Sequence, residues 1–325
     1  MDNIISNFKK SNILIIGDII LDQYWYVKNQ KKKFEKSAPI KNIKKIENRA
    51  GGAANVAKNI SKMGGNVHLI GIIGNDLEGS IVKNLINDNN IKHNLIINSN
   101  ATTIKKIRII SEKKQLIRLD LEEKYFIKNK RKILDITFNI IKNYDVIIIS
   151  DYNKGTLEET SSIIKIAKKL SIPVIIDPKK ENILKYLGAT LLTPNLEEFQ
   201  SIVGKCKNKL DLIKKGKNLI SKLKLSALLI TQAESGMTLI QNKKNPIHFQ
   251  ALSKNVNDPT GAGDTVVSMI GLILSLKKSF KTACLYANVA ASIVVKKLGT
   301  ATVGQKELLK KIKSFKNVKM SSIIK

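Results

Sequence analysis

The stretch NDPTGAGDT, residues 257–265, is followed at once by an apolar run that extends to Leu276. Its two glycines allow a sharp turn and a close approach of the backbone to a ligand, so the pattern predicts a turn that leads into a helix. The unpaired N–H groups in the first turn of such a helix favour negative charge. The stretch therefore predicts an anion-binding turn, although a simple turn with an aspartate cap fits the pattern equally well.

Asp264 lies within this turn, beside the expected anion rather than on it. A carboxylate is a poor ligand for phosphate, but next to a bound phosphate it can accept the proton of an attacking hydroxyl. On the anion-binding interpretation, Asp264 is a candidate general base for phosphoryl transfer.

The composition indicates a globular protein without a membrane anchor. The 325 residues are 43% hydrophobic, enough for one large α/β domain or two smaller ones. No apolar run approaches the roughly 18 residues that span a bilayer, and acidic residues interrupt the first apolar segment, so we expect neither a membrane partner nor a signal peptide. Two distant cysteines, Cys206 and Cys284, indicate reduced thiols in a cytoplasmic protein.

The formal net charge of +31 suggests nucleic-acid binding at first sight. The cations are almost all lysines, however, and they are spread along the chain without interleaved aromatic residues of the kind that stack on bases. We therefore expect a solvated lysine surface and no nucleic-acid partner. Arginine is rare, which favours a specific role where it occurs. The four arginines are Arg49, Arg108, Arg118 and Arg131.

Hydrophobic runs alternate with helical patterns along most of the chain, which predicts a mostly parallel sheet with flanking helices. Ligands bind at the carboxyl ends of the strands in such sheets. The first predicted strand ends at Asp18, with Asp22 just beyond, and these carboxylates are candidates either for binding sugar hydroxyls or for plain turn formation. Three later strands end in polar clusters at Asp151, at residues 177–179 and at residues 193–199.

Two further segments carry polar residues at predicted helix starts. Asn195 and Glu198 lie one turn apart and can act together on phosphate and hydrated Mg²⁺, although the same spacing is that of a helix cap. Gly51 and Gly52 predict a loop that enters a helix with its backbone against a ligand, and Asn55 would face inward one turn later.

Two strand pairs lie outside the parallel alternation. Residues 24–27 and 40–46 read as short strands around a charged turn at 31–36, and residues 102–110 and 115–121 predict a hairpin. We expect a small extra sheet over the active site, a lid drawn from about residues 22–48 and 102–121. Its cations would face either a phosphorylated substrate or solvent. These cations are Lys106, Arg108 and Arg118.

Two of these segments together resemble the signatures of a known family. Residues 51–57, GGAANVA, resemble the N-terminal signature of the ribokinase-like carbohydrate kinases, and residues 258–264, DPTGAGD, resemble their C-terminal signature. The resemblance covers essentially the whole chain. It implies a single ribokinase-like α/β domain over residues 1–325, in three layers, with a mostly parallel central sheet, flanking helices and a small β lid.

Position by position, the resemblance implies that Asp264 is the catalytic base and that the amides of Gly261, Ala262 and Gly263 form an anion hole. It implies that Glu198 acts on Mg²⁺ through water, and that a monovalent cation, potassium, lies near Asp258 and Thr260. The implied ATP contacts are Asn195, Leu196, Glu197, Glu198, Thr231, Gly236 and Asn288. The implied contacts to the sugar substrate are Asp18, Asp22, Gly51, Gly52, Asn55, Arg118, Asp151 and Lys179.

Further segments, such as GDIILDQYWY at residues 17–26 and LLTPNLEE at residues 191–198, resemble the branch of the family that acts on a heptose 7-phosphate. This resemblance implies ATP-dependent phosphorylation of the anomeric hydroxyl of D-glycero-β-D-manno-heptose 7-phosphate, in the biosynthesis of ADP-heptose for the lipopolysaccharide core. We do not expect the nucleotidyltransferase domain that often accompanies such kinases. The alternatives are another sugar or nucleoside acceptor, or a nucleic-acid-binding protein on a degenerate kinase scaffold. The exposed edges of the lid favour a homodimer.

Overall fold

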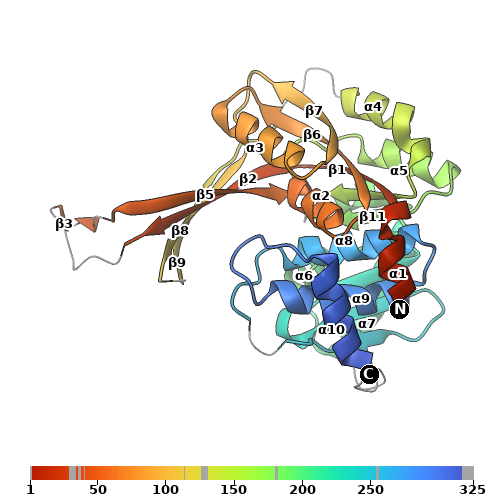
Figure 1. The fold of residues 1–325 in the computed structure, drawn as a ribbon. Helices are drawn as coiled ribbons and strands as arrows, with labels where there is room; N and C mark the ends of the chain where they lie inside the picture. Colours follow the sequence, from red (N-terminus) through yellow and green to blue (C-terminus); the bar gives the residue numbers. More distant parts are fainter. Residues whose placement is uncertain are drawn as a thin grey trace.

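The computed structural model describes residues 2–28, 34–35, 38–39, 41–112, 114–125, 131–179, 182–253 and 256–316. These residues form a large sheet between helices and a smaller sheet that projects to one side (Figure 1). The order of the nine strands in the large sheet is β15 (Ile247–Phe249), β14 (Met237–Gln241), β13 (Ala227–Thr231), β12 (Leu191–Leu192), β11 (Val174–Asp177), β10 (Val146–Ser150), β1 (Asn12–Gly17), β6 (Asn66–Gly74) and β7 (Lys92–Asn98). Strands from β13 to β7 pair in parallel, whereas β14 and β15 pair antiparallel, so the predicted mostly parallel sheet is confirmed.

The buried strands point alternate residues into two cores, one on each face of the large sheet. In β1, Ile13 and Ile15 belong to one core, and Leu14 and Ile16 belong to the other. Because both faces are covered, β1 is a continuous apolar run rather than an alternating one. The result is the three-layer α/β arrangement that the resemblance implied.

Helices from both halves of the chain cover these cores. The first core is covered by α1 (Asp2–Ser6), α2 (Ala53–Lys62), α3 (Leu77–Asn87), α8 (Ala262–Ser275), α9 (Phe280–Val294) and α10 (Gln305–Lys316). The second core is covered by α4 (Lys132–Ile140), α5 (Thr160–Lys169), α6 (Leu196–Val203) and α7 (Lys209–Leu223). Short 3₁₀ helices are η1 (Asn7–Lys10), η2 (Ile141–Asn143), η3 (Ile183–Tyr186) and η4 (Ala233–Ser235).

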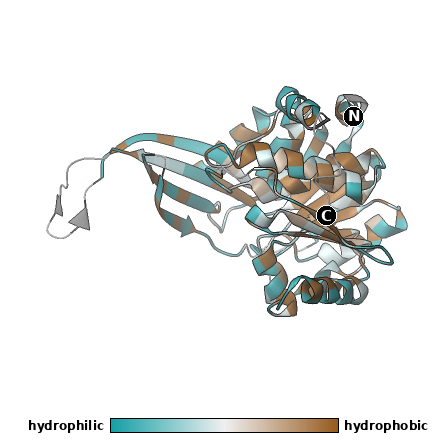
Figure 2. Cartoon of the chain, turned by 90° about the horizontal axis from the view of Figure 1, so that it is seen from below, coloured by the Kyte–Doolittle hydropathy of each residue, from teal (hydrophilic) through white to brown (hydrophobic). Residues whose placement is uncertain are grey.

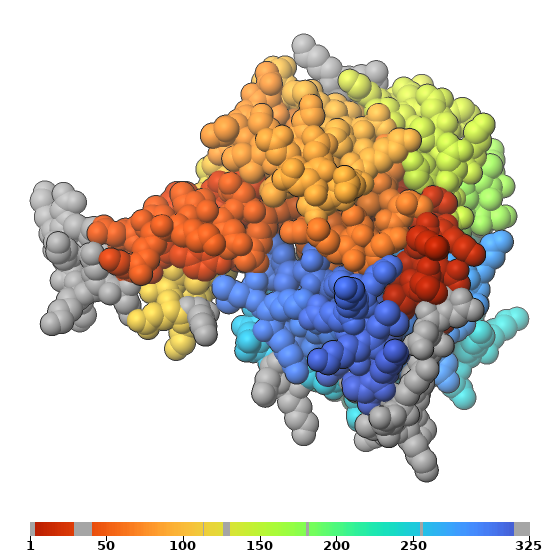
Figure 3. Space-filling view, viewed as in Figure 1, coloured from red at the N-terminus to blue at the C-terminus, as the bar shows by residue number. Residues whose placement is uncertain are grey.

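The smaller sheet is the lid, and it extends well beyond the body of the molecule (Figure 3). Its strand order is β5 (Ile43–Gly52), β2 (Ile19–Val27), β8 (Lys105–Ser111) and β9 (Lys114–Leu121). Strands β8 and β9 form the predicted antiparallel hairpin, and β2 pairs antiparallel with β5 and parallel with β8. A separate two-stranded pair contains β3 (Phe34–Glu35) and β4 (Ala38–Pro39).

The predicted strand at residues 40–46 was placed too early in the sequence. Strand β5 begins at Ile43 and continues to Gly52, so Gly51 and Gly52 end a strand rather than form a loop. A Cβ atom on Gly51 would lie 2.4 Å from the Asp22 carboxylate, and Gly52 has φ of 56°. These glycines therefore allow β5 to close against β2 before the chain enters α2. The predicted turn at residues 31–36 falls mostly outside the described residues.

The register gives the lid one polar face and one apolar face. Along the lid strands, hydrophilic and hydrophobic residues follow one another (Figure 2). On the polar face, Asp22 lies opposite Arg49 and Lys106, and Tyr24 lies opposite Arg108. The apolar face is largely solvent-exposed and carries Ile43, Ile46, Ile117, Leu119 and Leu121.

The polar face of the lid rests on a loop near the C-terminus. The Thr300 N–H donates to the Tyr24 hydroxyl at 3.1 Å, and Arg49 Nη1 donates to the Leu298 carbonyl at 2.7 Å. The Arg49 guanidinium also lies 4.5 Å from the centroid of the Tyr24 ring. The base of the lid is therefore attached to residues 298–300.

Two further features concern membrane-spanning helices and the cysteines. Among the described residues, no helix combines the length and the apolar character that crossing a bilayer requires. Cys206 and Cys284 are both free thiols, as the sequence indicated.

Asp18 holds the loop that follows β10. Its carboxylate is fully buried and accepts three backbone N–H groups, from Tyr152 at 2.8 Å, Lys154 at 3.1 Å and Thr156 at 3.3 Å. The sugar contact expected at Asp18 stays a prediction, and in the structure its oxygens accept the N–H groups of this loop. These contacts of Asp18 are those of a residue that shapes a turn, which was the alternative interpretation.

Replacing Asp18 with alanine should strongly destabilise the fold. The substitution leaves one buried and two partly buried N–H groups without their acceptor, so we expect the free energy of unfolding to fall by about 3 kcal/mol. Urea denaturation measures this change. The matched control is Asp88→Ala at an exposed position after α3, which should change stability by less than about 0.5 kcal/mol. Equal effects of the two substitutions would contradict the anchoring role of Asp18.

Candidate active site

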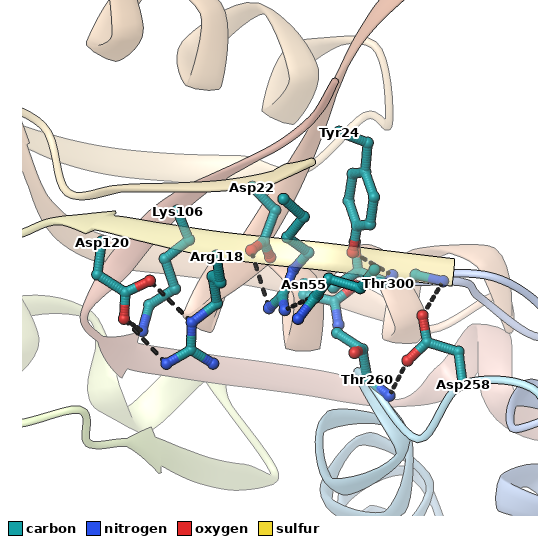
Figure 4. Close-up of polar contacts among 12 residues, drawn as sticks. Asp22, Tyr24, Asn55, Lys106, Arg118, Asp120, Asp258, Thr260 and Thr300 are labelled. Carbon is teal, nitrogen blue, oxygen red and sulfur yellow. Dashed lines mark hydrogen bonds and ion pairs between the residues drawn. The ribbon is translucent and has the colours of Figure 1, made fainter. Parts of the chain in front are cut away.

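The turn before α8 has the backbone geometry that the sequence predicted. Gly261 has φ of 79° and ψ of 2°, the values of the third residue of a type II turn, which strongly favours glycine. The Ala262 N–H closes this turn onto the Pro259 carbonyl at 3.1 Å. Asp258 joins the turn to the loop that carries the lid, because its two oxygens accept the N–H groups of Thr260 at 2.9 Å and Gly299 at 2.7 Å (Figure 4).

This geometry refines the expected anion hole. The Ala262 N–H is used within the turn, whereas those of Gly261 and Gly263 have no hydrogen-bond acceptor among the described residues. A Cβ atom on Gly263 would meet no atom within 4 Å, so its backbone faces open space. The N–H groups of Gly261 and Gly263 are therefore available to an anion. The potassium site at Asp258 and Thr260 stays a prediction, since the described contacts of Asp258 are with N–H donors.

Asp264 is buried and is held by two hydrogen bonds. Asn55 Nδ2 donates to Oδ2 at 2.6 Å, and the Tyr152 hydroxyl donates to Oδ1 at 3.3 Å. Burial raises the pKa of Asp264 to about 6, the hydrogen bond from Asn55 opposes this rise, and the nearby charge of Asp22 adds to it. A carboxyl with this pKa can exchange a proton near neutral pH.

Asn55 therefore contacts the candidate base, where a sugar contact was expected. Its own carbonyl accepts from Asn59 Nδ2 at 3.0 Å, and Asn59 Oδ1 accepts from the Thr265 hydroxyl at 3.2 Å. The two sequence signatures thus meet in one buried network between α2 and α8. Tyr152 was missed as a partner of Asp264, although it directly follows the polar residue at the end of β10.

Asp22 remains available for a ligand. Its side chain is 6% exposed, and its ion pair with Arg108 Nη2 is long, at 3.5 Å. Burial raises the pKa of Asp22, while the charges of Arg108 and Lys106 act in the opposite direction. Asp151 differs, because it accepts from the Tyr186 hydroxyl at 2.7 Å and the Asn153 N–H at 2.8 Å and pairs with Lys185. The protein itself thus supplies several partners to Asp151, and the expected sugar contact there stays a prediction.

Asn195 and Glu198 form a capping box at the start of α6. Asn195 Oδ1 accepts the Glu198 N–H at 2.8 Å, and Glu198 Oε2 accepts the Asn195 N–H at 2.9 Å. Glu198 Oε1 pairs with Lys179 Nζ at 2.6 Å. The helix-cap interpretation is thus correct. Lys179, an expected sugar contact, lies beside Glu198, which is one of the expected nucleotide contacts.

Asp177, at the end of β11, is a candidate site residue that was assigned no role from the sequence alone. Its pKa is raised well above the ordinary value by burial and by the neighbouring carboxylates of Asp264 and Glu198. No hydrogen bond to its side chain is present among the described residues. A site with such crowded carboxylates suits a divalent cation, which takes oxygen ligands. In the described part of the chain, no three or more His, Cys, Asp or Glu side chains are grouped so as to hold a metal ion directly, so Asp177 and Glu198 would hold Mg²⁺ through water.

A cavity of about 430 Å³ adjoins the turn. Its lining includes the expected nucleotide contacts Asn195, Thr231, Gly236 and Asn288, together with Ala262 and Gly263 of the turn. Its other walls are mainly apolar, from residues such as Leu252, Val256 and Val295, which suits a flat base. Leu196 and Glu197 are not in this lining, because Leu196 packs on the core and Glu197 is exposed.

The comparisons with known proteins agree with this geometry. The profile described as "pfkB family carbohydrate kinase" matches residues 10–307. A Buchnera aphidicola protein named "Uncharacterized sugar kinase" is 52% identical over 297 residues, which cover 91% of this chain and 95% of that protein. The bifunctional protein HldE of Haemophilus influenzae is 44% identical over 303 residues, which cover 93% of this chain but only 64% of HldE.

Among solved structures, phosphofructokinase-2 of Escherichia coli, crystallised with substrates and products, superposes with a TM-score of 0.79 at 19% identity. The superposition covers 94% of this chain and 99% of that structure, and it shows a common fold. The family match covers most of the chain and includes both signatures that meet at Asp264. The chain therefore belongs to the pfkB family of carbohydrate kinases, phosphotransferases that act on a sugar hydroxyl.

Proposed function

We propose that the chain transfers the γ-phosphoryl group of ATP to the anomeric hydroxyl of D-glycero-β-D-manno-heptose 7-phosphate, giving the 1,7-bisphosphate for ADP-heptose and lipopolysaccharide core synthesis in the cytoplasm. The supporting observation is the position of Asp264. The lining of the cavity includes Gly263, one residue before this carboxylate, and the charge of Asp22 on the lid raises the Asp264 pKa. The base thus lies between a cavity for ATP and the polar face of the lid. The similarity to HldE supports the choice of a heptose.

The proposed mechanism uses the turn and the base together. The attacking hydroxyl gives its proton to Asp264 as it approaches the γ-phosphorus in line. The free N–H groups of Gly261 and Gly263 stabilise charge on the transferring group, and such fixed donors supply much of the catalysis of phosphoryl transfer. Mg²⁺ held at Asp177 and Glu198 would neutralise charge on the phosphates of ATP. Asn55 and Tyr152 keep the carboxylate oriented.

A coupled assay of ADP release tests the acceptor. Heptose 7-phosphate is compared with the dephosphorylated heptose, fructose 6-phosphate and adenosine at equal concentrations. We expect the highest kcat/KM with heptose 7-phosphate. A higher value with a nucleoside or with another sugar would assign a different acceptor to the same site.

Replacing Asp264 with asparagine should lower kcat by roughly 10² or more, because the amide cannot accept the proton. The KM for ATP should change by less than about threefold, since ATP binds in the adjoining cavity. Steady-state kinetics measure both constants. The matched control, Asp135→Asn on the exposed side of α4, should keep wild-type kinetics. Full turnover by the Asp264 variant would exclude this residue as the base.

The pH dependence of kcat/KM should report the ionisation of Asp264. Activity should rise with pH through about 6, because only the ionised carboxylate can accept a proton. The hydrogen bond from Tyr152 lowers the Asp264 pKa, so Tyr152→Phe should move this rise to higher pH. Tyr144→Phe, which removes the hydroxyl that contacts His68 at 2.5 Å, is the matched control and should leave the profile in place. An unchanged profile for Tyr152→Phe would contradict the assignment.

We also propose that the apolar face of the lid pairs two chains. Leu119 and Leu121 on β9 are 43% and 47% exposed, and Ile43 and Ile46 on β5 are 48% and 49% exposed. Exposed apolar side chains gathered on one face of a sheet in this way favour an association surface. Light scattering should give a dimer for the wild type and a monomer for Leu119→Lys. Leu210→Lys on α7, at a position 77% exposed, should stay dimeric. A monomeric wild type would refute the pairing.

A further inference from the structure

The polar face of the lid concentrates arginine and lysine close to Asp22. Lys106 and Arg108 lie on β8, and Arg118 lies opposite Arg108 on β9. Two of these cations have carboxylate partners at the lid surface. Arg118 makes a two-point contact with Asp120 at 2.9 and 3.0 Å, and Lys106 lies 3.5 Å from Asp120 (Figure 4).

Arg108 is much less well satisfied than these cations. Its side chain is only 11% exposed, and its nearest carboxylate oxygen, on Asp22, is 3.5 Å away. Nη1 donates to the neutral Gln115 at 3.1 Å, and Nε is buried with no acceptor among the described residues. A buried guanidinium with unused N–H groups is costly, so its position favours an additional anionic partner.

The register adds a second observation. Arg108 and Arg118 lie directly opposite one another on the same face of the hairpin. Like charges in directly opposed positions of a sheet are unfavourable, unless an anion lies between or beside them. Their planar, forked guanidinium groups match the geometry of a phosphate.

The position of Arg108 also fits one end of the substrate. Asp22 contacts Arg108, and the charge of Asp22 reaches Asp264. Asp22 therefore lies near both groups, with its ion pair to Arg108 on the polar face of the lid. A sugar that presents its reacting hydroxyl to Asp264 and other hydroxyls to Asp22 would therefore direct its far end to Arg108.

Resting on the proposed kinase function, we propose that Arg108 binds the phosphate that the acceptor sugar already carries, with Arg118 as a second cation at its exposed side. Arg108 supplies the unused Nε–H and one Nη–H to the phosphate oxygens. The acceptor class is thus a sugar phosphate, and discrimination against neutral sugars and nucleosides resides in the lid hairpin.

The test measures how much the enzyme gains from the substrate's phosphate. For the wild type and for Arg108→Met, kcat/KM is compared between heptose 7-phosphate and the dephosphorylated heptose. Hydrogen bonds to charged groups correspond to about 10- to 150-fold each, so we expect the wild type to prefer the phosphorylated sugar by on the order of 100-fold or more. In Arg108→Met this preference should fall to less than about tenfold. Arg131→Met, at the exposed residue before α4, is the control and should keep the full preference.

Each outcome has a distinct meaning. If the wild type phosphorylates no sugar phosphate, the proposed function fails. If it does so and Arg108→Met keeps the full preference, the assignment of Arg108 is wrong. If Arg108→Met loses activity equally with both sugars, Arg108 positions Asp22 and does not bind the phosphate.

A second variant and a binding measurement separate misfolding from loss of recognition. Arg118→Gln changes an exposed side chain, so it should fold normally and reduce the preference for the phosphorylated sugar several-fold. Isothermal titration of inorganic phosphate should show weakened binding in both variants. Wild-type phosphate affinity in Arg118→Gln and Arg108→Met would overturn the proposal.

Discussion

The hydrogen bond between Asn55 and Asp264 is the contact on which the site depends. It joins two residues 209 positions apart, at 2.6 Å, within a buried interface between α2 and α8. A buried carboxylate is costly without a donor, and a hydrogen bond to a charged group contributes about 1.5–3 kcal/mol. The same interface includes the Ser268 hydroxyl, which donates to the Val56 carbonyl at 3.0 Å. The base is therefore held by the packing of two helices as well as by the hydrogen-bonded turn before it.

The parallel order of the strands explains why polar residues from distant segments gather at one edge of the sheet. The parallel strands β1, β10 and β11 all end there, and they deliver Asp18, Asp151 and Asp177. Only some of these carboxylates stay available for chemistry. Asp18 and Asp151 are used by backbone and side-chain donors of the protein, whereas Asp22, Asp177 and Asp264 have few or long contacts. Burial and nearby hydrogen-bond donors thus separate the carboxylates at this edge into those that support the fold and those that are available for chemistry.

The sequence predicted the parts of this structure that follow from local patterns. The buried parallel strands, the glycine-containing turn at Gly261 and the helix start at Asn195 depend on neighbours in the chain, and they were predicted correctly, whereas the lid strand at residues 40–46 was placed too early. The partners of side chains depend on tertiary packing, which local patterns do not contain. Asp18 and Asp22 looked equivalent after the first strand, yet only the folded loop at residues 152–156 distinguishes them.

The same reasoning accounts for the residues that were missed or misread. Asn55 was placed correctly as an inward-facing residue, but its partner lies on a helix far away in the sequence. Gly51 and Gly52 were read as a loop because glycine usually interrupts strands, whereas here its small size lets β5 approach Asp22. Arg108 was one of several lid cations in the sequence, and only its burial separates it from Arg118.

The loop at residues 298–300 contacts both the lid and the segment that leads into α8. It receives the lid through Tyr24 and Arg49, and Gly299 donates to Asp258 at the start of the catalytic turn. Any displacement of the lid would therefore act on the same segment that holds the turn before α8 through Asp258. One short loop thus makes the geometry of the turn depend on the position of a sheet that lies far from it in the sequence.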